Sequence, residues 1–88
     1  MKNNNATKEF NRKGMKKVLD KAAEIAKEEM NQKIHMDLEI AAMDTLTTSN
    51  VTNFIVVNSI NAAIKRCKKE EVIIALERLV IEAYQLAC

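Results

Sequence analysis

The chain is short, nearly free of turn-forming residues and close to electrical neutrality, with 14 basic and 12 acidic side chains. Its 88 residues suffice for one small domain, whose core is marginal unless oligomerisation supplements it. Proline is absent and Gly14 is the single glycine, which excludes glycine-rich phosphate-binding loops and the tight hairpins of β-proteins, so we expect an all-α fold.

The cysteines and the apolar runs indicate the compartment. Cys67 and Cys88 are too few for a secreted disulfide scaffold and too far apart in sequence for a metal pair, so we expect small apolar residues or free thiols. No uninterrupted apolar core follows Met1, and no apolar run approaches the roughly 20 residues of a membrane span. The composition therefore favours a cytoplasmic protein that needs neither membrane nor cofactor.

Basic side chains are concentrated at the N-terminus. Residues 1–21 carry seven basic and two acidic side chains, for +5, whereas residues 22–88 carry seven and ten, for −3. Two interpretations of this basic arm are open: a solvated leader, which we favour, or a salt-dependent contact to nucleic-acid phosphates. The side chains that would make such a contact are Lys8, Arg12, Lys13, Lys16, Lys17 and Lys21.

The first helix is expected to follow a polar leader. Residues 1–14 form this leader, which could be helical from about Ala6, and residues 15–88 form a single helical domain. Because a glycine costs a helix about 1 kcal/mol relative to alanine, Gly14 places the firm start of the helix near Met15.

A narrow apolar seam begins at Met15 and predicts a surface-lying helix. Opposite charges three or four residues apart, at Lys16/Asp20, Glu24/Lys27 and Glu29/Lys33, support such a helix by a few tenths of a kcal/mol each. The seam residues recur at helical spacing; they are Met15, Leu19, Ala22, Ala26 and Met30, with Val18 and Ile25 beside them.

The apolar register changes at residues 31–33. One helix from about residue 15 to 46 and two helices broken near 31–33 are both compatible with the sequence, and we slightly favour the broken form. Beyond the break two faces are apolar. Ile34, Leu38, Ala41 and Ala42 could continue the seam, and Met36, Ile40 and Met43 open a different face.

Hydroxyl and β-branched side chains from Thr47 to Asn50 indicate a stop and a restart. Ser49, Asn50 or Thr52 could cap the following helix, which we expect between Val51 and Cys67. Its apolar face carries Phe54, Val57, Ile60 and Ile64, with Val56 and Ala63 on the flank.

A short charged break at residues 65–71 makes the last two helices antiparallel neighbours. Lysine and arginine end the first of them, and Glu70 and Glu71 open the second, as the helix dipoles favour.

The last helix carries more apolar surface than one neighbouring helix can cover, since Ile73, Val80 and Tyr84 widen its main stripe. We therefore expect this hairpin to complete its core against a second copy or a partner, as a dimeric bundle. The expected interface residues are Val72, Leu76, Leu79, Ala83 and Leu86 on the stripe, and Ile74 and Ile81 on another side.

No group of residues points to chemistry. His35 is the only histidine; on a helix Glu39 would share its face and Asp37 would point away. A metal site needs three or four converging ligands, so we expect a surface histidine. The methionines are expected to fill the core. We therefore predict no catalytic, metal or cofactor site, and no enzyme.

Two motifs in the C-terminal half carry a family resemblance. Asn50-Val51-Thr52-Asn53 opens a helix with Ile60 and Ile64 at its spacing, and Leu76-Glu77 followed by Leu79-Val80 lies in the closing helix. With these motifs, residues 38–83 resemble the YmgB/AriR family of small biofilm and acid-resistance regulators, although the turn between the helices is shorter here. The resemblance implies a dimeric, all-helical regulator that acts through protein contacts, with DNA binding as a further property.

The sequence as a whole favours a small helical protein–protein interaction module, a homodimeric regulator that binds another protein. The alternative is a nucleic-acid-associated regulator that uses the basic arm. The residues do not distinguish a regulator from a chaperone or an inhibitor, and they do not identify the partner.

Overall fold

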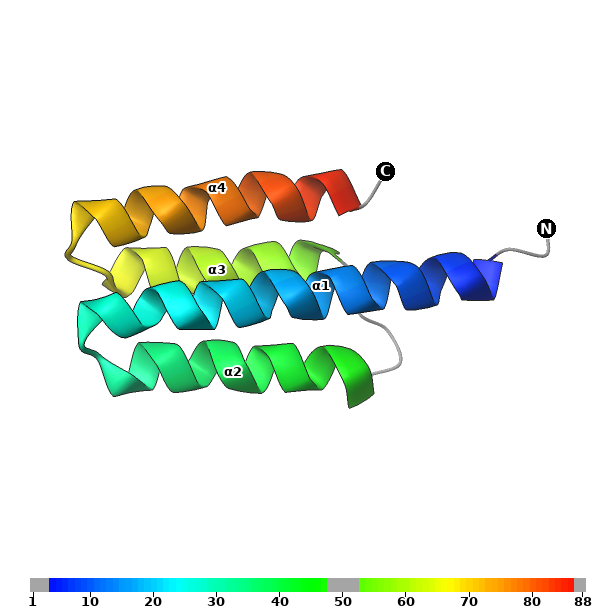
Figure 1. Cartoon of the computed structure of the whole chain (residues 1–88), viewed down its shortest axis with the longest axis horizontal. Helices are drawn as coiled ribbons and strands as arrows, with labels where there is room; N and C mark the ends of the chain where they lie inside the picture. Colours follow the sequence, from blue (N-terminus) through cyan, green and yellow to red (C-terminus); the bar gives the residue numbers. More distant parts are fainter. Residues whose placement is uncertain (1–3, 48–52, 87–88) are drawn as a thin grey trace.

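The computed structural model describes residues 4–47 and 53–86, and these form four helices that run alternately up and down (Figure 1). The described residues contain no strand, which confirms the predicted all-α fold. The Cα atoms extend over 45 × 22 × 15 Å. The elements are α1 (Asn4–Ala26), a 3-10 turn η1 (Lys27–Glu29), α2 (Gln32–Thr47), α3 (Asn53–Arg66) and α4 (Glu70–Leu86).

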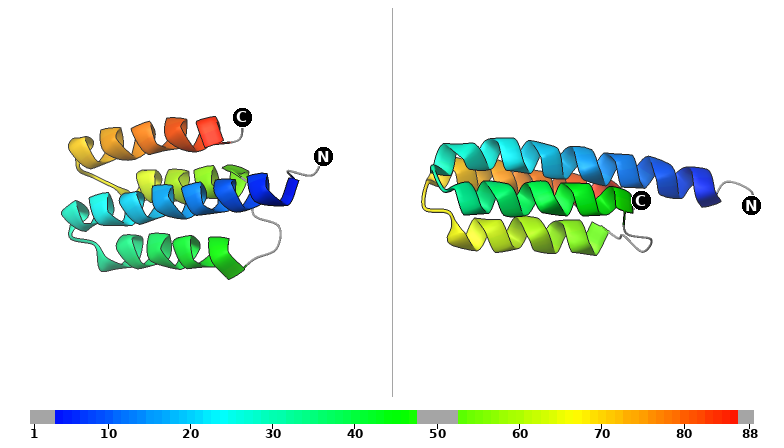
Figure 2. Two further views of the ribbon diagram at one scale, coloured as in Figure 1. Left: turned by 45° about the vertical axis from the view of Figure 1, so that its right-hand side comes forward. Right: turned by 90° about the horizontal axis from the view of Figure 1, so that it is seen from below.

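The four helices enclose one core, with α1 opposite α3 and α2 opposite α4 (Figure 2). Each helix turns one arc of apolar residues inward, at the spacing that a helix packed on two neighbours requires. None of the described helices is both long and apolar enough to cross a membrane. The largest fully buried apolar side chains are Val18, Leu19, Ile34, Leu38, Val56, Ile60, Val72 and Leu76.

The break between α1 and α2 confirms the favoured two-helix form. Met30 takes a left-handed conformation with φ of 59° and ψ of 28°, which ends η1. The side-chain Oδ1 of Asn31 then accepts hydrogen bonds from the backbone N–H groups of Lys33 at 3.1 Å and Ile34 at 3.4 Å. Asn31 is therefore the N-cap of α2. Because the helix has already ended, Met30 lies outside the seam predicted for it and is 85% exposed.

The start of α1 differs from the prediction. The helix begins at Asn4, close to the possible onset near Ala6 but well before the expected firm start at Met15, and it passes through Gly14 without interruption. Packing explains why glycine is tolerated: a Cβ atom at Gly14 would lie 2.8 Å from Cδ2 of Leu86. The missing side chain leaves room for the side chain of Leu86 to pack against α1 at this point, which opposes the helix-propensity cost of about 1 kcal/mol.

The main stripe of α4 packs inside the chain, against α1 and α3. This corrects the expectation that the C-terminal hairpin needs a second polypeptide to complete its core. The N-terminal half supplies two further helices, and α1 covers the side of α4 that α3 leaves open. Four predicted interface residues, Val72, Leu76, Leu79 and Ala83, are thereby buried.

Two aromatic residues were predicted on apolar stripes but lie outside them. On α3 the buried arc is centred on Ile60 and includes Val56 and Ala63, so Phe54 falls on its far side and is exposed. Tyr84 on α4 is likewise exposed rather than part of the widened stripe, whereas Ile73 and Val80 are partly buried, as expected. The predicted caps Ser49, Asn50 and Thr52 lie outside the described residues.

Candidate functional site

Of the seven predicted interface residues, only Ile74 and Ile81 remain well exposed. Leu86 is partly buried against the core beside Gly14, and the other four are core residues. Ile74 is 44% exposed and Ile81 is 60% exposed, although both are large apolar side chains. The candidate site is therefore narrower than the sequence indicated, and it lies on the outer face of the helix.

The outer face of α4 carries apolar and charged side chains in alternation. Ile74 and Ile81 lie two helical turns apart, and the exposed charges of Glu77 and Arg78 lie between them. The exposed ring of Tyr84 extends the apolar surface toward the C-terminal end. We call these five residues the α4 ridge.

A second exposed apolar surface lies on α2. Met36, Ile40 and Met43 follow one another at steps of four and three, so they share one side of the helix, and Met43 is 66% exposed. The exposed carboxylates of Glu39 and Asp44 flank them. We call these five residues the α2 face. The prediction that the methionines fill the core is therefore wrong for Met36 and Met43, because the inward arc of α2 is filled by Ile34, Leu38 and Ala42, and it is also wrong for the exposed Met30.

Fewer side chains of the basic arm are available for a nucleic-acid contact than the sequence suggests. Lys16 Nζ pairs with Asp20 Oδ2 at 2.7 Å, and Lys21 Nζ pairs with Glu82 Oε1 of α4 at 3.3 Å. Lys13 and Lys17 are exposed one turn apart on α1. Arg12 is partly buried, and the side chain of Lys8 lies outside the described part of the structure.

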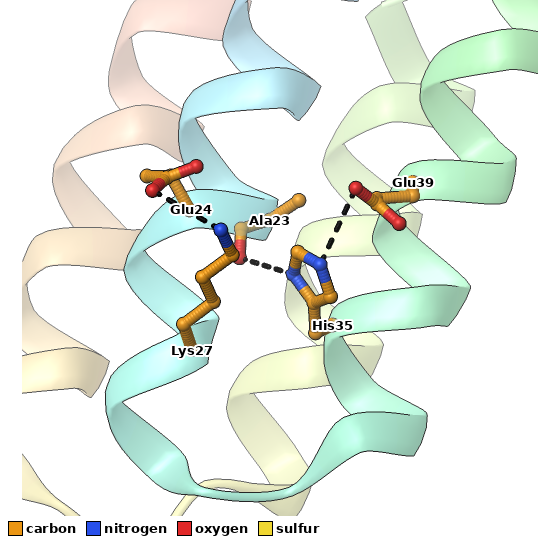
Figure 3. A network of polar contacts seen from close by, with 5 residues as sticks. All are labelled: Ala23, Glu24, Lys27, His35 and Glu39. Atoms are coloured by element: carbon orange, nitrogen blue, oxygen red, sulfur yellow. Dashed lines mark hydrogen bonds and ion pairs between the residues drawn. The ribbon is translucent and has the colours of Figure 1, made fainter.

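His35 joins α1 to α2 (Figure 3). Its Nδ1 lies 2.7 Å from the carbonyl oxygen of Ala23, to which it must donate, and its Nε2 lies 3.3 Å from Oε2 of Glu39. Asp37 points the other way and pairs with Arg66 of α3 at 2.8 Å. The predicted directions of Glu39 and Asp37 are confirmed, but His35 is partly buried and ties two helices together instead of lying on the surface.

An open hollow of about 220 Å³ adjoins this histidine, lined by Lys27, Met30, Asn31, Gln32 and His35. Among the described residues no three His, Cys, Asp or Glu side chains converge as a metal site. The titratable side chains that line the hollow are His35 and the exposed Lys27, and no described hydrogen bond or ion pair joins the two.

Glu29 makes a contact that the sequence did not indicate. Its carboxylate accepts backbone N–H groups of Lys68 at 3.1 Å and Lys69 at 2.7 Å, so it caps the N-terminus of α4 from a different turn. Glu29 does not form the predicted ion pair with Lys33, whereas the predicted ion pairs Lys16–Asp20 and Glu24–Lys27 are present. No signal in the sequence could have found this contact, because it joins residues about 40 positions apart.

The same turn buries Cys67. Burial raises the pKa of its thiol, and the nearby charge of Glu29 raises it further, while Arg66 acts in the opposite direction. A protonated, buried thiol is a poor nucleophile. Cys67 is a free cysteine that packs as a small apolar residue, as predicted; Cys88 lies outside the described residues.

Comparisons with models of protein families, with curated proteins and with solved structures find no match. The resemblance to the YmgB/AriR family therefore stays a prediction.

Proposed function

We propose that this chain is a small helical protein–protein interaction module, which acts as a homodimeric regulator by binding another protein. The observation that carries the proposal is that the core is closed by the chain's own helices, while large apolar side chains remain outside it on α2 and α4. Exposed apolar surface that is rimmed by polar residues is typical of protein interaction sites.

The α2 face fits the role of the partner-binding surface. Methionine side chains are flexible and polarizable, so Met36 and Met43 can adapt to partners of different shape. The carboxylates of Glu39 and Asp44 beside them favour a partner with basic residues flanking its apolar ones. An amphipathic basic helix has this combination.

Capture of partners from the source cell tests this function. The wild-type chain should retain a specific protein, and Ile40→Lys should lose it, because the added charge lies in the middle of the α2 face while Ile40 is too exposed for the fold to need it. Asn61→Lys adds the same charge at an exposed polar position of α3 and should retain the partner. Equal retention by Ile40→Lys would contradict the proposal.

A second candidate function is nucleic-acid association through α1. It is favoured by one observation: α1 projects beyond the ends of the other helices (Figure 1), and the exposed Lys13 and Lys17 lie on the same helix, where a nucleic-acid backbone can approach them. An electrophoretic shift with steep salt dependence should weaken when Lys13 and Lys17 become alanine. Unchanged nucleic-acid binding by that variant would contradict a contact through the basic arm.

A further inference from the structure

We propose that the α4 ridge is the homodimer contact, in which two copies of α4 pack antiparallel about a two-fold axis between Glu77 and Arg78. This inference rests on the proposed function, because it names the surface and the geometry of the self-association proposed there. The surface that meets the ridge belongs to a second copy of this chain, because the ridge is self-complementary.

The spacing of the apolar residues suits this axis. Ile74 lies as far before the midpoint between Glu77 and Arg78 as Ile81 lies after it. When α4 meets a second α4 in the opposite direction about that midpoint, Ile74 of one copy faces Ile81 of the other, twice over by symmetry. The two-fold axis therefore creates two Ile74–Ile81 contacts, which bury the exposed isoleucine side chains of both copies.

The charges on the ridge agree with the same arrangement. In the antiparallel pairing Glu77 of each copy faces Arg78 of the other, so two opposite-charge pairs form at the axis. Farther out, the carboxylate of Glu70 faces the amide of Gln85. In a parallel pairing each of these side chains would meet its own copy, Glu77 against Glu77 and Arg78 against Arg78. The sequence of the ridge therefore selects the antiparallel direction.

The α2 face lacks this self-complementarity. A two-fold contact centred on Ile40 would bring Glu39 and Asp44 of both copies close to the axis with no exposed cation of α2 nearer than Lys33. Like charges at the centre of a contact oppose association. We therefore assign the second copy to α4 and keep α2 for a different protein.

Sedimentation equilibrium on charge-reversed variants tests the pairing. One pair of helices buries less area than a standard interface of roughly 1,600 Å², so the dimer should dissociate at accessible concentrations and shifts should be measurable. Glu77→Arg or Arg78→Glu alone should raise the dissociation constant roughly tenfold, since each reverses two symmetry-related pairs. The double variant Glu77→Arg/Arg78→Glu restores opposite charges and should return to within about threefold of wild type.

Two further variants complete the design. Ile81→Lys should give a monomer whose circular dichroism matches that of the wild type, because Ile81 lies outside the core. Asp44→Arg makes a similar charge change on the α2 face and should leave the dissociation constant unchanged.

The possible outcomes distinguish a failure of the antiparallel α4 contact from a failure of the proposed homodimer. If the wild type is dimeric but the single reversals have no effect, a parallel or different contact is present and the antiparallel ridge is overturned, while the homodimer stands. If Asp44→Arg alone shifts the equilibrium, the contact lies on α2. A wild type that is monomeric at every concentration overturns the homodimer and the ridge together.

Discussion

Glu29 joins the two turns at one end of the bundle, because its carboxylate accepts hydrogen bonds from the backbone N–H groups of Lys68 and Lys69. Its pKa is lowered, chiefly because the carboxylate accepts the N–H of Lys69; burial works in the opposite direction, and the N–H of Lys68 and the two lysine charges lower it further. A negative charge at this place also complements the dipole of α4. The side chain therefore stabilises the folded chain only while it is ionised.

This contact predicts a specific acid response. Because the pKa of Glu29 is lower in the folded chain than in the unfolded one, its contribution is complete above the ordinary carboxyl pKa and is lost as the pH falls through the lowered value. Glu29→Gln should lower the melting temperature at neutral pH and lose less stability than wild type on acidification. Thermal unfolding followed from neutral to acidic pH measures both effects.

Glu28→Gln provides the matched control for this prediction. Glu28 is the neighbouring exposed carboxylate and makes no described contact with α4, so its substitution should leave the pH profile unchanged. Parallel profiles of wild type and Glu29→Gln would show that the cap contributes nothing to stability.

At the scale of the elements, the α1–α2 connection contains the one described non-glycine residue with a positive φ. A left-handed conformation costs an L-residue roughly 1–2 kcal/mol, and Met30 makes up for little of it, since its side chain is exposed. Met30→Gly should therefore stabilise the chain by about 1 kcal/mol in urea unfolding. Met30→Ala keeps the Cβ atom and should not; equal stability of the two variants would contradict the account.

Local pattern was sufficient to predict most of the elements. The switch of apolar register at Asn31, a strong N-cap residue, indicated the break between α1 and α2, and the charges around Cys67 indicated the turn between α3 and α4. The onset of α1 at Asn4 is close to the possible onset near Ala6, but the firm start near Met15 was wrong, because the sequence could not show that Gly14 makes room for Leu86 in three dimensions. The exposure of Phe54 likewise depends on which arc of α3 faces the core.

At the scale of the whole molecule, the buried stripe and the α4 ridge predict different results for the same substitution. Leu79 is 6% exposed within the core, so Leu79→Lys places a charge among apolar side chains and should unfold the chain. Ile81→Lys, two residues further along, should keep the helical circular dichroism spectrum. Similar thermal unfolding curves for both variants would contradict the assignment of Leu79 to the core.

The candidate site could be predicted only in part, because a local sequence pattern does not show which helices pack together. The apolar spacing of α4 showed that the helix has more than one apolar side, but it could not show that α1 covers the main stripe. The sequence placed Ile74 and Ile81 on a separate side of α4, and both are exposed there; their role as interface residues stays a prediction. The α2 face with its flanking carboxylates could not be predicted either, because its composition depends on which side chains the bundle leaves exposed.

The molar mass of the wild-type chain, measured by light scattering over a wide range of concentration, tests the central claim most directly. A closed core with apolar side chains outside it predicts a rise from the monomer mass of 10.0 kDa toward twice that value. A mass that stays at 10.0 kDa up to the highest concentration would contradict the claim that this chain associates with itself.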